Sequence, residues 1–222
     1  MCAMLRAVTF VTIGQTPRTD LVPELASWLP DDLEVHELGA LDGMGEEAVA
    51  ALAPEEGEAR LVTRMADGRQ VVVAKWWMDA RLQQMLDGLR PGADHATVLL
   101  CTGSFPRLRP SGLFLDAQHL VDHGVAALSA GMRRIGLVLP LAEQAGQVHL
   151  RPAAHQEVVT THASPYEGDR FDEAGRALAH CDAVVMHCMG YTEEQRRRVA
   201  AAAGRPVLLA RRFVAAALVQ LL

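Results

Sequence analysis

Two cysteines, Cys101 and Cys188, occupy matching settings in the sequence. The first lies in LLCTG from Leu99 and the second in MHCMG from Met186, so each follows an apolar run and precedes a glycine by two positions. Glycine lets backbone amides approach a ligand closely. The candidate substrate-binding residues beside the two thiols are Thr102, Gly103, Met189 and Gly190.

Two thiols that face each other could invert a stereocentre. One thiolate removes the proton from a carbon next to a carboxylate or carbonyl, and the opposite thiol returns a proton to the other face. This chemistry needs no metal or pyridoxal when backbone amides and side-chain donors stabilise the enolate. We expect each thiol at a strand-to-helix junction, where the positive end of the helix favours the thiolate.

Two other interpretations of Cys101 and Cys188 stay open. One thiolate alone could add to a double bond or carbonyl and form a covalent intermediate. Alternatively, both cysteines only pack in the protein interior, because free cysteine is among the most buried residue types. In that case the protein would bind a small anion without catalysis.

The segment GQTPRTD from Gly14 lies between the first expected strand and the first expected helix. Amides at the helix start, the side chains of Gln15 and Thr16 and the guanidinium of Arg18 would together hold a carboxylate. Helix capping also explains this composition, with a threonine as N-cap and Pro17 at the first helical position. Both interpretations can hold at once.

Three features surround Cys188. The run from Thr192 to Gln195 is a capping box that starts a helix, and Tyr191 just before it could project its hydroxyl into a cleft as a substrate contact. His187 alternates to the opposite side of its strand, which favours a buried, hydrogen-bonded histidine over a catalytic base. The turn at residues 164–166 is either a surface turn or a substrate contact.

The number and spacing of the cysteines argue against disulfide bonds and against a metal site. The chain has four cysteines and no CxxC pair, and a chain of 222 residues can bury a core without disulfides. The spacing of Cys181, His187 and Cys188 does not match a zinc site. We therefore expect free thiols, including Cys2, and neither a metal nor a cofactor.

Composition places the chain among globular proteins. Hydrophobic residues make up 50% and charged residues 22% of the sequence. The net charge of -6 provides no basic surface for nucleic acid. The apolar stretch near the N-terminus is too short to span a membrane and lacks a cleavage pattern, so we expect a cytoplasmic protein without a membrane partner.

Short strand-like runs alternate with stretches of helical periodicity, which predicts an α/β fold with parallel sheets. Strands rich in Val, Leu and Ile suit a sheet covered on both faces. The expected strands are residues 7–13, 33–36, 96–101, 135–139, 158–161, 183–187 and 207–209. The expected helices are residues 20–28, 46–52, 112–128 and 212–222.

The chain divides into two halves that share the same order of strand-like and helix-like segments but differ in sequence. The run from Val11 matches that from Val138, and the two cysteine segments match each other. We expect subdomains at 1–108 and 109–210, with the helix 211–222 packing back on the first. The Asp67-Gly68 turn predicts an antiparallel hairpin added to the first half.

Several segments along nearly the whole chain resemble the AroM family of bacterial proteins. That family is similar to the aspartate/glutamate/hydantoin racemase superfamily, whose fold consists of two facing α/β halves with the substrate between them and a cysteine from each. The segments that carry the resemblance are TIGQTPR from Thr12, GALDG from Gly39, LVTRMADG from Leu61, LLCTGSFP from Leu99, ASPYEG from Ala163 and CMGYT from Cys188.

The resemblance implies roles for individual residues. Cys101 would be the first cysteine of the superfamily and Cys188 the second, because CMG looks like the CAG-type turn of hydantoin racemases. Gln15 and Thr16 would lie on the loop that holds the substrate carboxylate. No histidine follows Cys188 closely as it does in glutamate racemases, so glutamate is a disfavoured substrate. His187 stands where the family pattern has aspartate, so the resemblance assigns no acidic partner to Cys188.

Together these observations predict a cofactor-independent racemase or isomerase of a small carboxylate or cyclic amide. Cys101 and Cys188 would act as opposed acid and base. The alternatives are a single-cysteine isomerase or decarboxylase similar to maleate isomerases, and a non-catalytic binder of small anions, since a shared fold does not fix function. A homodimer is plausible only because homodimers are the commonest protein oligomers.

Overall fold

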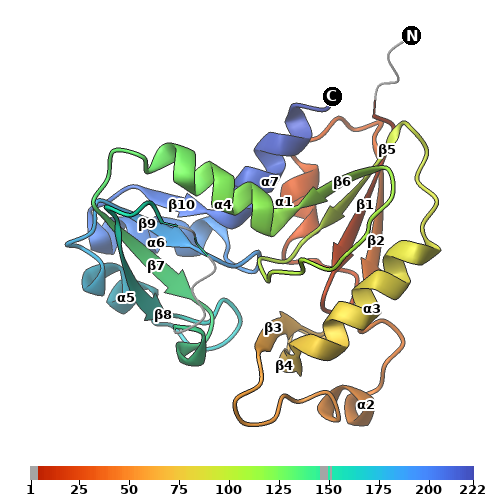
Figure 1. Cartoon of the computed structure of the whole chain (residues 1–222), viewed down its shortest axis with the longest axis horizontal. Helices are drawn as coiled ribbons and strands as arrows, with labels where there is room; N and C mark the ends of the chain where they lie inside the picture. Colours follow the sequence, from red (N-terminus) through yellow and green to blue (C-terminus); the bar gives the residue numbers. More distant parts are fainter. Residues whose placement is uncertain (1–4, 146–149, 151) are drawn as a thin grey trace. The chain divides into compact units, whose positions relative to one another are not determined.

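A computed structural model describes residues 5–145, 150 and 152–222 of the chain. Backbone contacts divide the chain into two compact units (Figure 1). The first unit runs to Asp116 and includes Ala217–Leu222, and the second is Ala117–Ala216. Each unit contains its own parallel sheet.

Four parallel strands form the sheet of the first unit. They are β1 (Ala7–Thr12), β2 (Glu34–Gly39), β5 (His95–Leu99) and β6 (Leu113–Asp116), in the order β2-β1-β5-β6. The helices of this unit are α1 (Val22–Ala26), α2 (Glu46–Ala50) and α3 (Lys75–Gly88). The inner strands β1 and β5 are buried along almost their whole length, as expected for apolar strands covered on both faces.

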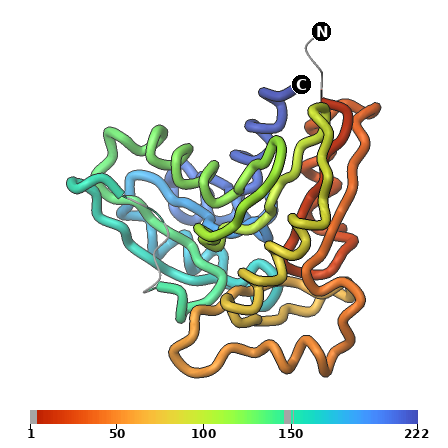
Figure 2. Tube along the Cα trace, turned by 45° about the vertical axis from the view of Figure 1, so that its right-hand side comes forward, coloured from red at the N-terminus to blue at the C-terminus, as the bar shows by residue number. Residues whose placement is uncertain are grey.

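An antiparallel hairpin is added to this unit, as predicted. It consists of β3 (Arg60–Arg64) and β4 (Gln70–Ala74). Only Gly68 in its turn has a positive φ, of 93°, so the connection is longer than a two-residue turn. The N–H of Gln15 donates to the Arg64 carbonyl at 3.1 Å, which places the hairpin beyond the carboxyl end of β1 (Figure 2).

The second unit has a sheet of the same kind. Its strands are β7 (Arg134–Leu139), β8 (Glu157–His162), β9 (Ala183–Met186) and β10 (Val207–Leu209), in the order β10-β9-β7-β8. Its helices are α4 (Ala117–Leu128), the 3-10 turn η1 (Ala142–Gln144), α5 (Phe171–Ala177), α6 (Glu193–Ala203) and the start of α7 (Ala210–Val219).

The two sheets share one topology. In each, the strand that comes first in the chain lies between the second and the third, and the fourth pairs with the third. Strands β1, β2, β5 and β6 thus correspond to β7, β8, β9 and β10. This arrangement confirms the predicted repetition of the two halves, and both cysteines follow the third strand of their sheet.

The helix expected over residues 112–128 is wrong in its first part. Residues Leu113–Asp116 form strand β6, which pairs with β5, and α4 begins directly at Ala117. Because no turn residue separates the strand from the helix, the apolar residues of the strand extend the helical pattern in the sequence.

The first helix also begins later than expected. Helix α1 starts at Val22 without a side-chain cap, so neither threonine of GQTPRTD caps it. The N–H groups of Thr16 and Arg18 instead donate to the carboxylates of Asp42 and Glu37, each at 2.7 Å. These carboxylates from β2 and the following loop hold Thr16 and Arg18 in the loop before the helix.

Candidate functional site

Cys101 lies two residues beyond the end of β5 and is only 7% exposed. Its Sγ accepts a hydrogen bond from the N–H of Gly103 at 3.3 Å. The neighbouring Leu100 N–H donates to the Val11 carbonyl at 2.8 Å, which fixes this turn beside the end of β1. A Cβ on Gly103 would lie 2.8 Å from a methyl of Leu61, so the hairpin encloses the turn closely.

Cys188 repeats this arrangement in the second unit. It lies two residues beyond the end of β9, is 9% exposed, and its Sγ accepts the N–H of Gly190 at 3.4 Å. A Cβ on Gly190 would lie 2.4 Å from the hydroxyl oxygen of Tyr166. In both units, a side chain therefore packs closely on the glycine two residues after the cysteine, and the amide of that glycine supplies a donor to the sulfur.

A buried arginine holds the Cys188 turn in place. The guanidinium of Arg211, 1% exposed at the start of α7, donates to the carbonyls of Met189 at 2.9 Å and Gly190 at 3.1 Å. Sequence reasoning missed Arg211. The available signal was a charged residue at the boundary between a buried strand and an apolar helix.

The expected helix N-terminus beside each thiol is absent among the described residues. Helix α6 begins at Glu193, five positions after Cys188, and the next helix after Cys101 is α4 at Ala117. Instead, the N–H groups of Gly103 and Gly190 donate to the two sulfurs.

The loop after β1 is built around Gly14 and Gln15. A Cβ on Gly14 would lie 2.4 Å from the Arg64 carbonyl oxygen of the hairpin, so only glycine fits there. The Gln15 amide donates to the carbonyls of Leu41 at 3.2 Å and Met44 at 3.0 Å. In this structure the Gln15 side chain joins the loops after β1 and β2.

Thr16 and Arg18 bind carboxylates of the chain itself. The Thr16 hydroxyl donates to Asp42 at 2.8 Å. Arg18, which is 4% exposed, makes two hydrogen bonds to Asp20, at 2.9 and 2.8 Å, and one to the Thr12 hydroxyl at 2.7 Å. Direct contact of Gln15, Thr16 or Arg18 with a substrate stays a prediction.

The charge on Asp20 is well stabilised. Its partial burial would raise its pKa, but the hydrogen bond and charge of Arg18 and the charge of Arg64, 3.2 Å away, together hold the pKa below its usual value. Asp20 is therefore ionised at neutral pH and neutralises Arg18.

Tyr191 is completely buried. Its hydroxyl donates to the Ala163 carbonyl at 2.7 Å, and its ring packs edge-on against Phe171. Burial, and then the nearby Cys188 and Tyr166, raise the pKa of Tyr191 well above its usual value. Its hydroxyl therefore stays protonated and joins the loop after β8 to the Cys188 turn, and its contact with a substrate stays a prediction.

The capping box after this turn is confirmed. The Thr192 hydroxyl accepts the N–H of Gln195 at 3.2 Å, and the Gln195 side chain accepts the N–H of Thr192 at 2.9 Å.

The model of one protein family, described as AroM protein, matches residues 8–222. The chain belongs to the AroM family. A comparison with curated proteins finds no match. The family membership confirms the resemblance seen in the sequence.

Solved structures of enzymes share the fold of this AroM-family chain. A Nocardia farcinica maleate cis-trans isomerase, in a cysteine-to-serine variant with a covalently bound succinylcysteine intermediate, is 15% identical, with a TM-score of 0.53 over 98% of this chain and 92% of that chain. An allantoin racemase from Pseudomonas fluorescens is 12% identical, with a TM-score of 0.53 over 97% and 91%. An arylmalonate decarboxylase is 16% identical, with a TM-score of 0.50 over 97% and 91%.

These similarities establish the fold. The AroM-family chain has the α/β architecture of this group of racemases, isomerases and decarboxylases, with an antiparallel hairpin in its first unit. At these identities the structures do not assign an activity to it.

The other cysteines and His187 complete the account of candidate reactive groups in the AroM-family chain. Cys101, Cys181 and Cys188 are free thiols, whereas Cys2 lies outside the described residues. Burial raises the pKa of Cys181. His187 is buried, as predicted. Within the described chain no group of histidine, cysteine or acidic residues is arranged to hold a metal ion, and no helix has the length and apolar character to cross a membrane.

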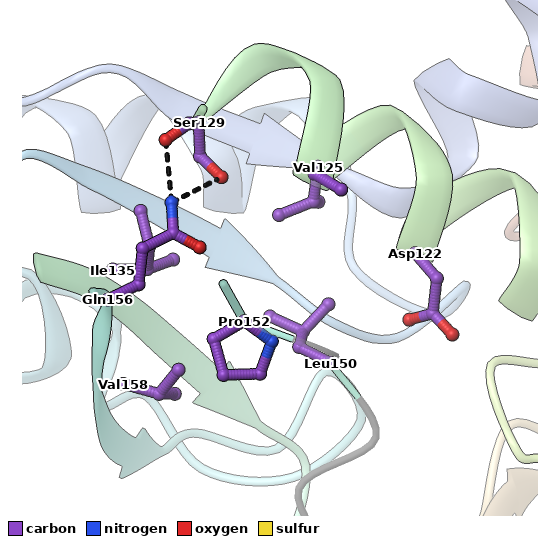
Figure 3. A pocket seen from close by; sticks show the side chains of 9 residues that line it. Asp122, Val125, Ser129, Ile135, Leu150, Pro152, Gln156 and Val158 are labelled. Atoms are coloured by element: carbon purple, nitrogen blue, oxygen red, sulfur yellow. Dashed lines mark hydrogen bonds between the residues drawn. The ribbon is translucent and has the colours of Figure 1, made fainter. Parts of the chain in front are cut away.

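A small pocket elsewhere in the second unit offers little chemistry (Figure 3). Apolar side chains of α4, β7 and β8 form much of its lining, and Asp122 is its one charged lining residue. The Gln156 amide donates to the carbonyl of Ser129 at 2.7 Å and contacts its hydroxyl at 3.3 Å. These polar groups thus satisfy one another, and the pocket contains neither Cys101 nor Cys188.

Proposed function

We propose that this AroM-family protein is a cofactor-independent racemase or isomerase of a small carboxylate or cyclic amide. One observation carries the proposal. Both sheets place a cysteine after their third strand, and in both the sulfur accepts the N–H of the glycine two residues later. A residue that served only for packing would not need the same turn and the same donor in two unrelated sequences.

In the proposed reaction, Cys101 and Cys188 approach the reacting carbon from opposite sides. One thiolate takes the proton from the carbon next to the carboxylate or carbonyl, so that the thiolate becomes a thiol and the substrate becomes an enolate. The opposite thiol then gives its proton to the other face of that carbon and becomes the thiolate. The product is the opposite stereoisomer, and the reverse reaction uses the same two groups with their roles exchanged.

The enolate requires hydrogen-bond donors. We propose that Thr102 in one turn and Met189 in the other present backbone amides to the carboxylate oxygens. Gly103 and Gly190, whose amides bind the sulfurs, would let the substrate approach each turn closely. The hydrogen bonds that Gln15, Thr16 and Arg18 make within the chain hold the loop after β1, and we propose that this loop, with Gly14, binds the substrate carboxylate.

A second candidate uses one cysteine as a nucleophile. It is supported by the fold shared with the maleate isomerase that carries a succinylcysteine. In this reaction a thiolate adds to a carbon–carbon double bond, rotation follows, and the thiolate leaves again. A mass increase equal to one substrate on a single cysteine would distinguish this reaction from proton transfer.

Exchange with deuterated solvent tests the proposed function. Single enantiomers of amino acids, hydroxy acids, 2-arylpropionic acids and hydantoins are incubated with the protein in D2O, and proton NMR follows the signal next to the carboxyl or carbonyl group. We expect at least one compound to lose this signal while its optical rotation decays. Exchange no faster than in protein-free samples for every compound would overturn the proposal.

A further inference from the structure

The hydroxyl of Tyr166 lies directly on the Cys188 turn. Its oxygen is 2.4 Å, and the ring carbon that carries it 2.6 Å, from the position a Cβ would take on Gly190. The N–H of the same glycine donates to the Sγ of Cys188 at 3.4 Å. Gly190 therefore packs against the Tyr166 phenol and donates its N–H to the Cys188 sulfur.

Hydrogen bonds hold the loop that carries Tyr166. The Ser164 hydroxyl accepts the N–H of Tyr166 at 3.0 Å, the Pro165 carbonyl accepts the Gln195 amide at 3.1 Å, and Tyr191 holds the residue before this turn. Gln195 and Tyr191 both come from the segment that follows Cys188. The loop after β8 is thus fastened to the Cys188 turn, and the phenol keeps its place on Gly190.

The chain has only two tyrosines, and both lie at this turn. They differ in exposure, because Tyr191 is fully buried and bonded to a carbonyl whereas Tyr166 is partly exposed. In this structure the Tyr191 hydroxyl binds Ala163. A partly exposed phenol held against the glycine of a reactive-cysteine turn is instead placed to meet a ligand, since a neutral tyrosine donates a strong hydrogen bond to a carboxylate or enolate oxygen.

We infer that Tyr166 is a substrate-binding residue of the Cys188 half of the site. Its hydroxyl donates to a carboxylate oxygen of a substrate in which the carbon next to that carboxylate reacts with Cys188. The inference rests on the proposed function, because it takes Cys188 as the reacting thiol. It assigns the turn at residues 164–166 to ligand binding, one of the two interpretations that the sequence left open.

Alkylation of Cys188 tests this role without a known substrate. Iodoacetate and iodoacetamide carry the same reactive carbon, but only iodoacetate places a carboxylate next to it. Tyr166→Phe keeps the ring on Gly190 and removes the donor. In this variant we expect the rate of Cys188 modification by iodoacetate, followed by peptide mass spectrometry, to fall about tenfold, and the rate with iodoacetamide to change less than about twofold.

The control variant is Thr161→Val, which removes a hydroxyl from β8 just before the same loop and should change neither rate. An equal fall with both reagents would show that Tyr166 acts on the thiol and would overturn the inference, as would unchanged rates with both. The alkylation requires no turnover. A lowered iodoacetate rate without solvent exchange would therefore contradict the proposed function alone, and exchange without a lowered rate would contradict the role of Tyr166 alone.

Discussion

Serine in place of either Cys101 or Cys188 is expected to lower the rate of stereochemical inversion by about 1,000-fold. A serine hydroxyl holds its proton far more tightly than a thiol, so it is a poor base from one side and a poor acid from the other. The measurement is the decay of optical rotation for the compound that exchanges in D2O. Each variant should keep slow deuterium exchange from one enantiomer only, and the two variants should prefer opposite enantiomers.

The matched control is Cys181→Ser, which changes a buried cysteine of the second unit that does not follow the end of a strand. Its inversion rate should stay within about twofold of the parent protein, as is usual away from the reacting groups. Inversion at more than a tenth of the parent rate in Cys101→Ser or Cys188→Ser would rule out the two-thiol mechanism. Complete loss in one variant and none in the other would support the nucleophilic mechanism instead.

Replacing Arg211 with methionine is expected to give the second largest effect. The variant loses the donors that hold the carbonyls of Met189 and Gly190. Because a misplacement of about 1 Å can cost about 100-fold in rate, we expect inversion to fall by about that factor. Hydrogen bonds from a charged group contribute about 1.5 to 3 kcal/mol, so the free energy of unfolding should fall by about 2 kcal/mol in urea titrations.

Arg212→Met provides the control for this prediction. Arg212 is the next residue of α7, is exposed, and pairs with Glu193 at 2.9 Å. Exposed pairs contribute little, so the free energy of unfolding should change by less than about 1 kcal/mol and the inversion rate should hardly change. If Arg211→Met and Arg212→Met have the same inversion rate, Arg211 does not position the reactive turn.

Most of the fold could be predicted from local patterns. Buried strands such as β1 and β7 are continuous apolar runs, and the Asp67-Gly68 pair marks the hairpin, because both signals depend on neighbouring residues alone. Strand β6 was missed because it joins α4 without a turn. The start of α1 was misplaced because Asp42 and Glu37, distant in sequence, take the amides of the preceding loop.

In the candidate site, too, the features that local sequence determines could be predicted, and those that depend on distant contacts could not. The two cysteine turns could be found from the sequence because each carries its own glycine two residues later. For Arg211 the sequence offers only a charged residue between a buried strand and an apolar helix, which does not identify its partners Met189 and Gly190, about twenty positions away. Tyr166 was recognised only as part of a turn, since its contact with Gly190 depends on how the loop after β8 folds onto the turn after β9.

The proposed mechanism requires the Cys101 and Cys188 thiols to meet at one substrate, and cross-linking tests this directly. In a variant with serine at Cys2 and Cys181, only these two thiols remain, and dibromobimane links two thiols only when they lie close together. The account predicts one fluorescent adduct per chain that joins the peptides of Cys101 and Cys188. Separate adducts on the two cysteines, with no linked peptide, would contradict it.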